Sequence, residues 1–326
     1  MNASDAKRSA QRGEAERSPG AVGDDGVVAA PLVHLIDAHV YVFRAWFSLP
    51  PMLAPDGTPC GAAYGFANTL IRYLGERDPS HLACCFDFAM TSFRNELFPG
   101  YKASRGTQAP PELEPQFALC QAAARALGLT VFEAERYEAD DVIATLAERL
   151  CAGGARVVIV STDKDLCQLV REDGAAIHHD LQRERTLDAK GVRERFGVAP
   201  ARIPDWLALV GDAVDDLPGV PGFGPKSAAA ALAAFGELEG FPADPARWSA
   251  AGLRGAERLA GRFAEHRERA FEVRALATLV RDVPALDVEL DQLTWRGADA
   301  PAFDALCRRL GWGRIATRVP RWRPDV

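Results

Sequence analysis

Short apolar runs alternate with helical patterns along most of this chain. Apolar, strand-like segments occur at 32–36 (LVHLI), 82–86 (LACCF), 129–135 (LTVFEAE) and 157–160 (VVIV). Between them, residues 61–77, 115–128 and 137–150 repeat apolar positions at helical spacing. Continuous apolar strands that alternate with helices are typical of a parallel sheet covered on both faces. The pattern therefore predicts an α/β domain over residues 29–200, with a mostly parallel sheet flanked by helices.

Acidic residues follow three of the predicted strands. Asp37, Asp87 and Asp163 lie at or just past strand ends, and the helix at 137–150 begins with further acids. In open α/β sheets the ligand crevice lies outside the carboxyl ends of the strands, and helix N-termini face the same edge. Nine carboxylates thus become candidates for one crevice: Asp37, Asp87, Glu138, Asp140, Asp141, Asp163, Asp165, Asp212 and Asp215.

Helix capping is the simplest alternative for the acids at 138–141, because carboxylates stabilise the positive end of a helix dipole. Capping does not explain acids after three strands, since so much like charge in a crevice repels itself. Divalent cations relieve that repulsion, and carboxylate oxygens are ligands that Mg²⁺ and Mn²⁺ prefer. The set is large enough for two ions, and two ions about 4 Å apart promote phosphodiester hydrolysis.

A glycine-rich segment occupies residues 209–236 (LVGDAVDDLPGVPGFGPKSAAAALAAFG). Gly219, Gly222 and Gly224 permit a tight turn between two helices, and a proline at 225 suits the first turn of the second helix. Exposed N–H groups at that helix start, beside Lys226, favour phosphate binding. The segment is predicted to contact nucleic-acid backbone rather than base sequence. A plain helix–loop–helix with glycine caps is the alternative.

A long connection follows Asp87 at residues 88–115. It carries Arg94, Lys102 and Arg105 just past an acidic strand end. Long structured connections at that edge are often functional, although a solvated loop is the simpler interpretation.

Composition refines these predictions. The 326 residues have a net charge of −7, and removing the nine acids leaves +2, so the remaining surface can meet phosphate. The seven cysteines lack C-x-x-C spacing, and no secretory signal is recognised, which favours reduced thiols and a cytoplasmic location. No apolar stretch approaches the roughly 18 residues of a membrane helix. Residues 1–28 are polar and mixed in charge, and we expect a disordered tail.

Five motifs in order resemble one family. LIDAHVYVFRAW, FDFAMTSFRNELFPGYKASR, YEADDVIATLA, STDKDL and LVGDAVDDLPGVPGFGPKSAAAAL are similar to the 5′-nuclease, or flap endonuclease, family. The likeness runs from about Val33 to about Val283 and is closest to the N-terminal 5′→3′ exonuclease domain of bacterial DNA polymerase I, here expected as a stand-alone protein.

The resemblance implies a PIN-like, Rossmann-like sheet with an arch insertion at about 90–115. It also implies a helix-three-turn-helix DNA-binding subdomain at about 203–236 within residues 201–326, followed by a C-terminal helical region. Two Mg²⁺ or Mn²⁺ ions are implied, with Asp163 between two ligand groups. The first group is Asp37, Asp87, Glu138, Asp140 and Asp141, and the second is Asp165, Asp212 and Asp215.

The resemblance also implies residue roles in DNA binding and cleavage. Lys102 and Arg94 would point at the scissile phosphate from the arch. The glycine hairpin would bind duplex backbone and K⁺ through loop carbonyls. The implied DNA-binding residues are Arg105, Gly219, Gly222, Gly224, Lys226 and Ser227. Asp216 departs from the family pattern, which has Asn there, so it either strengthens or crowds the second ligand group.

The expected function is a two-metal 5′→3′ exonuclease and structure-specific 5′-flap endonuclease acting on DNA in replication and repair. We expect a monomer that binds DNA with a 5′ flap, nick or 5′ end, with a DNA polymerase or ligase as partner. A PIN-type ribonuclease would not need the hairpin or the insertion, and a non-catalytic DNA-binding relative would have lost several acids. An aspartyl-phosphate phosphatase needs a second acid where this chain has His39.

Overall fold

A six-stranded sheet forms the centre of the computed structural model, which describes residues 30–104 and 110–324. The strand order is β3-β2-β1-β4-β5-β6. Strands β1 to β5 pair in parallel, and β6 pairs antiparallel with β5. The bounds are β1 Leu32–Asp37, β2 His81–Cys85, β3 Thr130–Phe132, β4 Arg156–Val160, β5 Ala176–Asp180 and β6 Arg185–Leu187. The predicted mostly parallel α/β sheet is confirmed.

The sheet changes direction of growth between β1 and β4. From β1 the chain builds β2 and β3 on one side, then returns to place β4 and β5 on the other. Ile36 lies beside Val160, so the carboxyl ends of β1 and β4 are neighbours. Such a switch point leaves a crevice outside the strand ends. The segments after Asp37 and Val160 therefore border one crevice.

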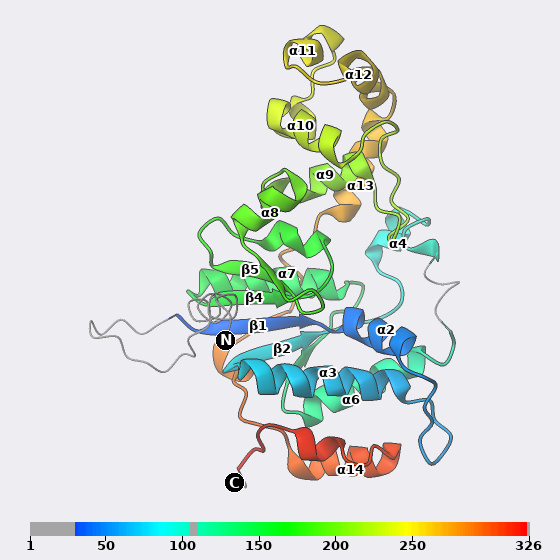
Figure 1. Ribbon diagram of the computed structural model, residues 1–326, viewed down its shortest axis with the longest axis vertical. Coiled ribbons are helices and arrows are strands. Elements are labelled where there is room, and N and C mark those ends of the chain that lie inside the picture. The colour runs from blue at the N-terminus through cyan, green and yellow to red at the C-terminus, as the bar shows by residue number, and fades with distance from the viewer. Residues whose placement is uncertain (1–29, 105–109, 325–326) are drawn as a thin grey trace, which may run out of the picture.

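Alternate residues of the strands enter two different cores. Ile36 packs on the side of α2 (Ala38–Ser48), α3 (Gly61–Arg77), α6 (Glu114–Ala126) and α14 (Ala300–Leu310). Leu35 packs on the side of α7 (Ala139–Ala152). Figure 1 shows α3 and α6 on one face of the sheet and α7 on the other. Burial of both faces explains why the strands read as continuous apolar runs.

A third core lies beyond the β5–β6 edge and carries the glycine hairpin. Trp248 is fully buried there and contacts the rings of Phe235 and Phe241. The helices are α8 Ala189–Phe196, α9 Ile203–Val210, α10 Pro225–Phe235, α11 Pro245–Ala250, α12 Ala256–Glu265 and α13 Arg267–Ala277. Short 3₁₀ helices are η1 Asp165–Leu169, η2 Pro200–Arg202 and η3 Leu238–Gly240. In Figure 1, α11 and α12 lie at the opposite end of the molecule from α14.

The C-terminal part of the chain returns to the sheet. Trp295 and Phe303 are buried with α3 and α6, and η5 (Ile315–Arg318) packs against the same core. The expected helical region after the hairpin therefore divides between two cores. The boundary near residue 200 stays a prediction.

Residues 286–290 (LDVEL) alternate apolar and acidic positions as a strand does, but they form no strand. Leu286 and Leu290 pack on the α7 side of the sheet without forming a strand, and η4 (Leu290–Leu293) begins within this segment. The carbonyl of Leu286 accepts a hydrogen bond from the Arg149 side chain instead of from a strand. The predicted strand at 129–135 forms over Thr130–Phe132 alone.

The described part of the predicted arch contains one short helix, α4 (Phe93–Leu97), capped by the Ser92 side chain. Arg105 and the predicted tail at 1–28 lie outside the described residues. Among the helices that the structure describes, none has the length and apolar character needed to span a membrane.

Candidate active site

A cavity of about 590 Å³ opens at the carboxyl ends of the strands. Its lining brings together acids from five separate segments: Asp37, Asp87, Asp140, Asp163 and Asp212. The cavity therefore lies where strand ends and the start of α7 meet.

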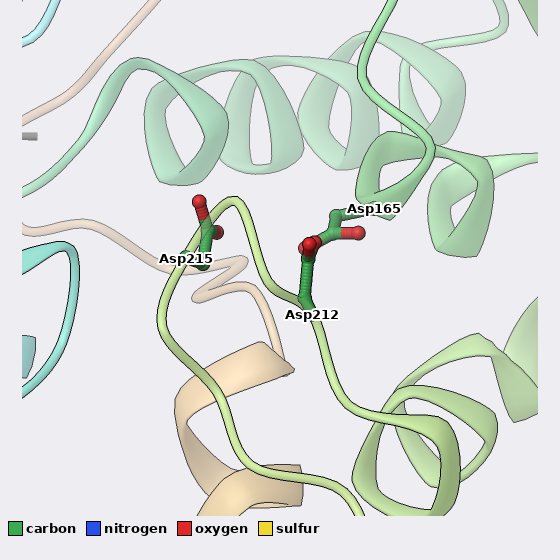
Figure 2. Close-up of side chains that lie close together, drawn as sticks. All are labelled: Asp165, Asp212 and Asp215. Atoms are coloured by element: carbon green, nitrogen blue, oxygen red, sulfur yellow. The ribbon is translucent and has the colours of Figure 1, made fainter. Parts of the chain in front are cut away.

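A second acidic group lies beside this cavity. Asp165, Asp212 and Asp215 each offer a carboxylate oxygen, and these oxygens lie within 4.8 Å of one another. Figure 2 shows Asp212 and Asp215 on one loop, with Asp165 close to Asp212. Paired hydrogen bonds between the backbones of Asp212 and Leu217, of 2.9 and 2.8 Å, close that loop.

The second group suits a divalent cation. Asp165 Oδ1 is buried, and no described residue gives it a hydrogen bond. Burial, followed by the charge of Asp163, raises the pKa of Asp165 well above its ordinary value. Three converging carboxylates with an unsatisfied oxygen are the donor set that hard divalent cations prefer.

The acids of the first group, which include Asp37 and Asp140, would also be stabilised in their ionised form by a cation. Asp37 is 3% exposed and accepts a 2.6 Å hydrogen bond from the Ser161 hydroxyl. Burial is the largest cause that raises the pKa of Asp37 to about 6; Asp163 and Asp87 act in the same direction, and Ser161 and His39 act against it. Burial and the charge of Asp37 also raise the pKa of Asp140. A bound cation would favour the ionised form of each.

Asp87 is held in its ionised form by neighbours. Its carboxylate accepts a 2.6 Å hydrogen bond from the Ala139 N–H and lies 2.8 Å from His39 Nδ1. Burial opposes ionisation, but His39 and Lys102 lower the pKa of Asp87 overall. His39 stacks on Phe117 with 4.3 Å between ring centroids. His39 was not predicted as a site residue. Its position two residues after Asp37 is the sequence feature that could have indicated a place at the crevice.

Glu138 accepts hydrogen bonds from three groups of the arch segment. Lys102 Nζ lies 2.6 Å away, the Tyr101 hydroxyl 3.1 Å and the Ser92 hydroxyl 2.7 Å. Burial alone would raise the pKa of Glu138, but Lys102 and Arg94 lower it. Glu138 therefore fixes the arch segment at the cavity, and Lys102 lines that cavity.

Arg94 and Asp141 differ from their expected roles. They form a bidentate ion pair with distances of 2.6 and 2.7 Å, and their side chains are 1% and 0% exposed. Arg94 also donates to the carbonyls of Leu276 and Thr278, and Asp141 accepts from the Val280 N–H. Because their hydrogen-bonding groups are engaged inside the protein, the geometry does not fit a phosphate contact by Arg94 or metal ligation by Asp141.

The base of the arch is tied to the second acidic group. The Lys102 N–H donates to the Asp215 carbonyl at 3.0 Å, and the Ser104 N–H donates to Asp216 Oδ2 at 2.8 Å. Asp216 has a φ of 54°, a left-handed conformation that Asn and Asp tolerate better than most residues. Its carboxylate thus joins two segments.

The glycine hairpin forms between α9 and α10; Asp212, Ala213 and Val214 at the start of this connection line the cavity, whereas Gly219, Gly222 and Gly224 do not. A Cβ on Gly219 would lie 2.4 Å from the Val210 carbonyl oxygen, so only glycine fits there. Gly222 has a φ of 93°. Gly224 caps α10, and its N–H donates to Ser227 Oγ at 2.9 Å. Lys226 is exposed at the same helix start.

Three cavity residues were missed as site residues. The Lys164 ammonium contacts Asp212 and lies 3.5 Å from Asp165. Its position between two site acids in STDKDL was a signal for it. Arg183 and Arg195 line the cavity from the β5–β6 turn and α8. No motif marks these two arginines, because only the fold brings them to the crevice.

Comparisons with known proteins agree with this arrangement. Residues 32–197 match the family model of the N-terminal resolvase-like domain of 5′-3′ exonuclease, and residues 198–301 match that of its C-terminal SAM fold. The chain is 42% identical over 282 residues to DNA polymerase I of Pseudomonas aeruginosa. The matched region covers 86% of this chain and 30% of that protein. The chain thus spans under a third of that relative's length.

Two further proteins are similar over much of their length. The chain is 38% identical over 207 residues to a 5′-3′ exonuclease of Aquifex aeolicus, covering 64% of this chain and 71% of that protein. The flap endonuclease of bacteriophage T5, solved as a pseudo-enzyme–product complex with DNA and metal ions, is 18% identical with a TM-score of 0.60. It covers 89% of this chain and all of that chain. This last likeness shows a shared fold.

Proposed function

The chain belongs to the 5′-3′ exonuclease family and is a nuclease, and on that premise we propose that it hydrolyses DNA phosphodiester bonds at 5′ ends and 5′ flaps. The observation that carries the proposal is the meeting of two acidic groups at one cavity at the switch point of the sheet. Replication and repair are the processes in which such cleavage would serve.

Two divalent ions, Mg²⁺ or Mn²⁺, fit these groups. The residues that would hold the first are Asp37, Asp87, Asp140 and Asp163, which line the cavity. Those that would hold the second are Asp165, Asp212 and Asp215. When bound, such ions supply an activated water and stabilise charge on the phosphate and leaving oxygen.

Protein side chains supply the remaining steps. Lys102 lines the cavity with its ammonium beside Glu138, so it can donate to a phosphate oxygen on which charge develops. Glu138 positions Lys102, and the buried Arg94–Asp141 pair joins the arch segment to α7. No histidine is needed as a general base.

The hairpin is the proposed duplex-binding element. Lys226 and the N–H groups at the start of α10 suit backbone phosphate, since helix N-termini attract anions. Carbonyls of the loop with Gly219 and Gly222 would hold K⁺. Arg105 is proposed to contact the DNA strand near the arch. We propose a monomer that binds 5′-flap, nicked or 5′-ended DNA and that works with a DNA polymerase or ligase.

A comparison of substrates tests this function. Labelled 5′-flap DNA, nicked duplex and single-stranded RNA are incubated with the protein, with and without Mg²⁺. We expect Mg²⁺-dependent release of 5′ products from the two DNA substrates. Cleavage of the RNA with intact flap DNA would instead indicate a PIN-type ribonuclease.

A further inference from the structure

Arginines also contribute to the cavity, and this group is here called the basic wall. Arg183, in the turn between β5 and β6, and Arg195, near the end of α8, line the same cavity as Asp37 and Asp163. Arg185 of β6 belongs to the same group, because Arg183 and Arg185 both contact Asp180. The cavity lining therefore carries guanidinium groups as well as carboxylates.

The wall has more positive charge than its carboxylates neutralise. Asp180 accepts a 2.9 Å hydrogen bond from Arg183 and lies 3.8 Å from Arg185. The neighbouring Glu184 pairs with Arg77. In the described part of the chain, no carboxylate lies within ion-pair distance of Arg195. Two guanidinium groups therefore share Asp180, and that of Arg195 has no carboxylate partner among the described residues.

The arginines also show the effect of this crowding. Partial burial, and then the charges of Arg185 and Arg183, lower the pKa of Arg195 below its ordinary value. Arg185 Nε is buried and has no hydrogen-bond partner among the described residues. An anion bound in the cavity would relieve the repulsion and accept hydrogen bonds from the guanidinium groups of Arg183 and Arg195, which line it.

The carboxylates of the cavity do not form ion pairs with these arginines, because they have other partners. Asp37 and Asp87 are engaged with Ser161 and His39, and Lys164 already contacts Asp212. The acids would also be neutralised by metal ions in the proposed reaction. Phosphate is the anion that DNA presents, and the guanidinium fork matches phosphate oxygens in pairs.

We propose that Arg183 and Arg195 bind a phosphate of the cleaved strand next to the scissile phosphate. This proposal rests on the proposed nuclease function. Phosphate contacts set register along a strand without reading sequence. The two arginines are thus positioning and specificity residues, because they determine which phosphodiester linkage reaches the acids of the cavity.

Neutral phosphate analogues test the contact. Arg195→Ala and Arg183→Ala are compared with wild type on 5′-flap DNA that carries one methylphosphonate on either side of the scissile linkage. On unmodified DNA, each variant should lose roughly 10- to 100-fold in single-turnover kcat/KM, the loss of one charged hydrogen-bond contact. Products shifted by one nucleotide should increase. Affinity measured in Ca²⁺ should fall as well.

Coupling decides the result. At one of the two methylphosphonate positions, the kcat/KM of wild type should fall by as much as each arginine substitution lowers it on unmodified DNA. The kcat/KM of the variants should fall no further on that modified DNA. Arg193→Ala is the matched control, because Arg193 lies on the same helix but pairs with Glu172 outside the cavity lining. Arg195→Lys keeps the charge without the fork and should recover part of the loss.

Several outcomes overturn the proposal. Unchanged cleavage in both arginine variants would refute the contact. So would losses of kcat/KM in the variants that add to the effect of the methylphosphonate at both positions. In either case, cleavage by wild type would leave the nuclease function standing. If Arg183→Ala fails to fold, Arg195→Ala and Arg195→Lys decide alone. A wild type that leaves unmodified flap DNA uncut in Mg²⁺ would refute the proposed function itself.

Discussion

Asp37 and Glu138 are buried carboxylates beside one cavity, yet their pKa values move in opposite directions. Asp37 has one hydroxyl donor and acidic neighbours, whereas Glu138 has Lys102 and the Arg94 guanidinium close by. The difference separates a carboxylate that needs a cation from one that already has cations. Sequence position could predict that both lie at the crevice, because strand ends and helix starts are local features. It could not predict their partners, which are Ser161 after β4 for Asp37 and the arch segment for Glu138.

Arg94 tests this distinction between structural and reacting groups. Arg94→Ala leaves Asp141 buried without its partner, so the free energy of unfolding should fall by about 3–5 kcal/mol. Urea denaturation measures the change. Arg136→Ala is the control, since Arg136 pairs with Glu96 at the exposed surface, and it should change stability by less than about 1 kcal/mol. Unchanged stability with lost cleavage in Arg94→Ala would restore the phosphate-contacting role.

Two elements divide DNA binding from chemistry. The arch segment is joined to the loop of Asp215 and Asp216 by two backbone N–H groups, whereas the hairpin presents Lys226 to solvent. The strands and helices around the acids were predictable from periodicity. The alternation of apolar and acidic residues at 286–290 reflects packing against the α7 side of the sheet, and alternation alone does not supply a pairing strand.

Substitution of one lysine in each element separates the roles. Lys102→Ala should lower the single-turnover rate by roughly a hundredfold or more with a modest change in affinity, because its charge acts where negative charge develops. Lys226→Ala should weaken affinity for all DNA sequences and reduce the salt slope by about one ion. Titration and single-turnover assays on one 5′-flap substrate measure both. Exchanged phenotypes would require the arch and hairpin roles to be exchanged.

At the scale of the whole molecule, the folded chain brings carboxylates together in the crevice, and their negative charge is not fully compensated. The acids come from segments that span β1 to the loop after α9, so charge repulsion and metal binding act on the folded chain as a unit. The mostly parallel sheet followed from alternating strands and helices, whereas the strand order did not. The return of α14 to the α3–α6 face could not be predicted, because it depends on contacts between apolar surfaces far apart in sequence.

Removal of one crevice charge should stabilise the metal-free protein in a pH-dependent way. The pKa of Asp37 is raised to about 6, so its native form holds a proton that the unfolded chain loses near pH 4. The associated stability is present below pH 4 and is lost as pH rises through about 6. Asp37→Asn should therefore gain stability relative to wild type across that range, by up to about 3 kcal/mol.

The comparison with wild type is necessary because two buried histidines act in the opposite direction. Burial lowers the pKa values of His34 and His178 to about 4, so their contribution rises with pH over the same range. Chemical denaturation of both proteins at pH 4 to 8 in EDTA isolates Asp37. Millimolar Mn²⁺ should raise the melting temperature of wild type at neutral pH. A pH-independent difference, together with no effect of Mn²⁺, would contradict a charged metal site.

The most direct measurement is single-turnover cleavage of a labelled 5′-flap DNA by wild type and Asp163→Asn over a Mg²⁺ titration. Asp163 affects both acidic groups, since its charge raises the pKa of Asp37 and of Asp165. Wild type should need Mg²⁺ with a cooperative dependence. Asp163→Asn should lose at least about a thousandfold in rate while its DNA affinity in Ca²⁺ stays near that of wild type. Cleavage by wild type in EDTA, or wild-type rates in Asp163→Asn, would contradict the two-metal account.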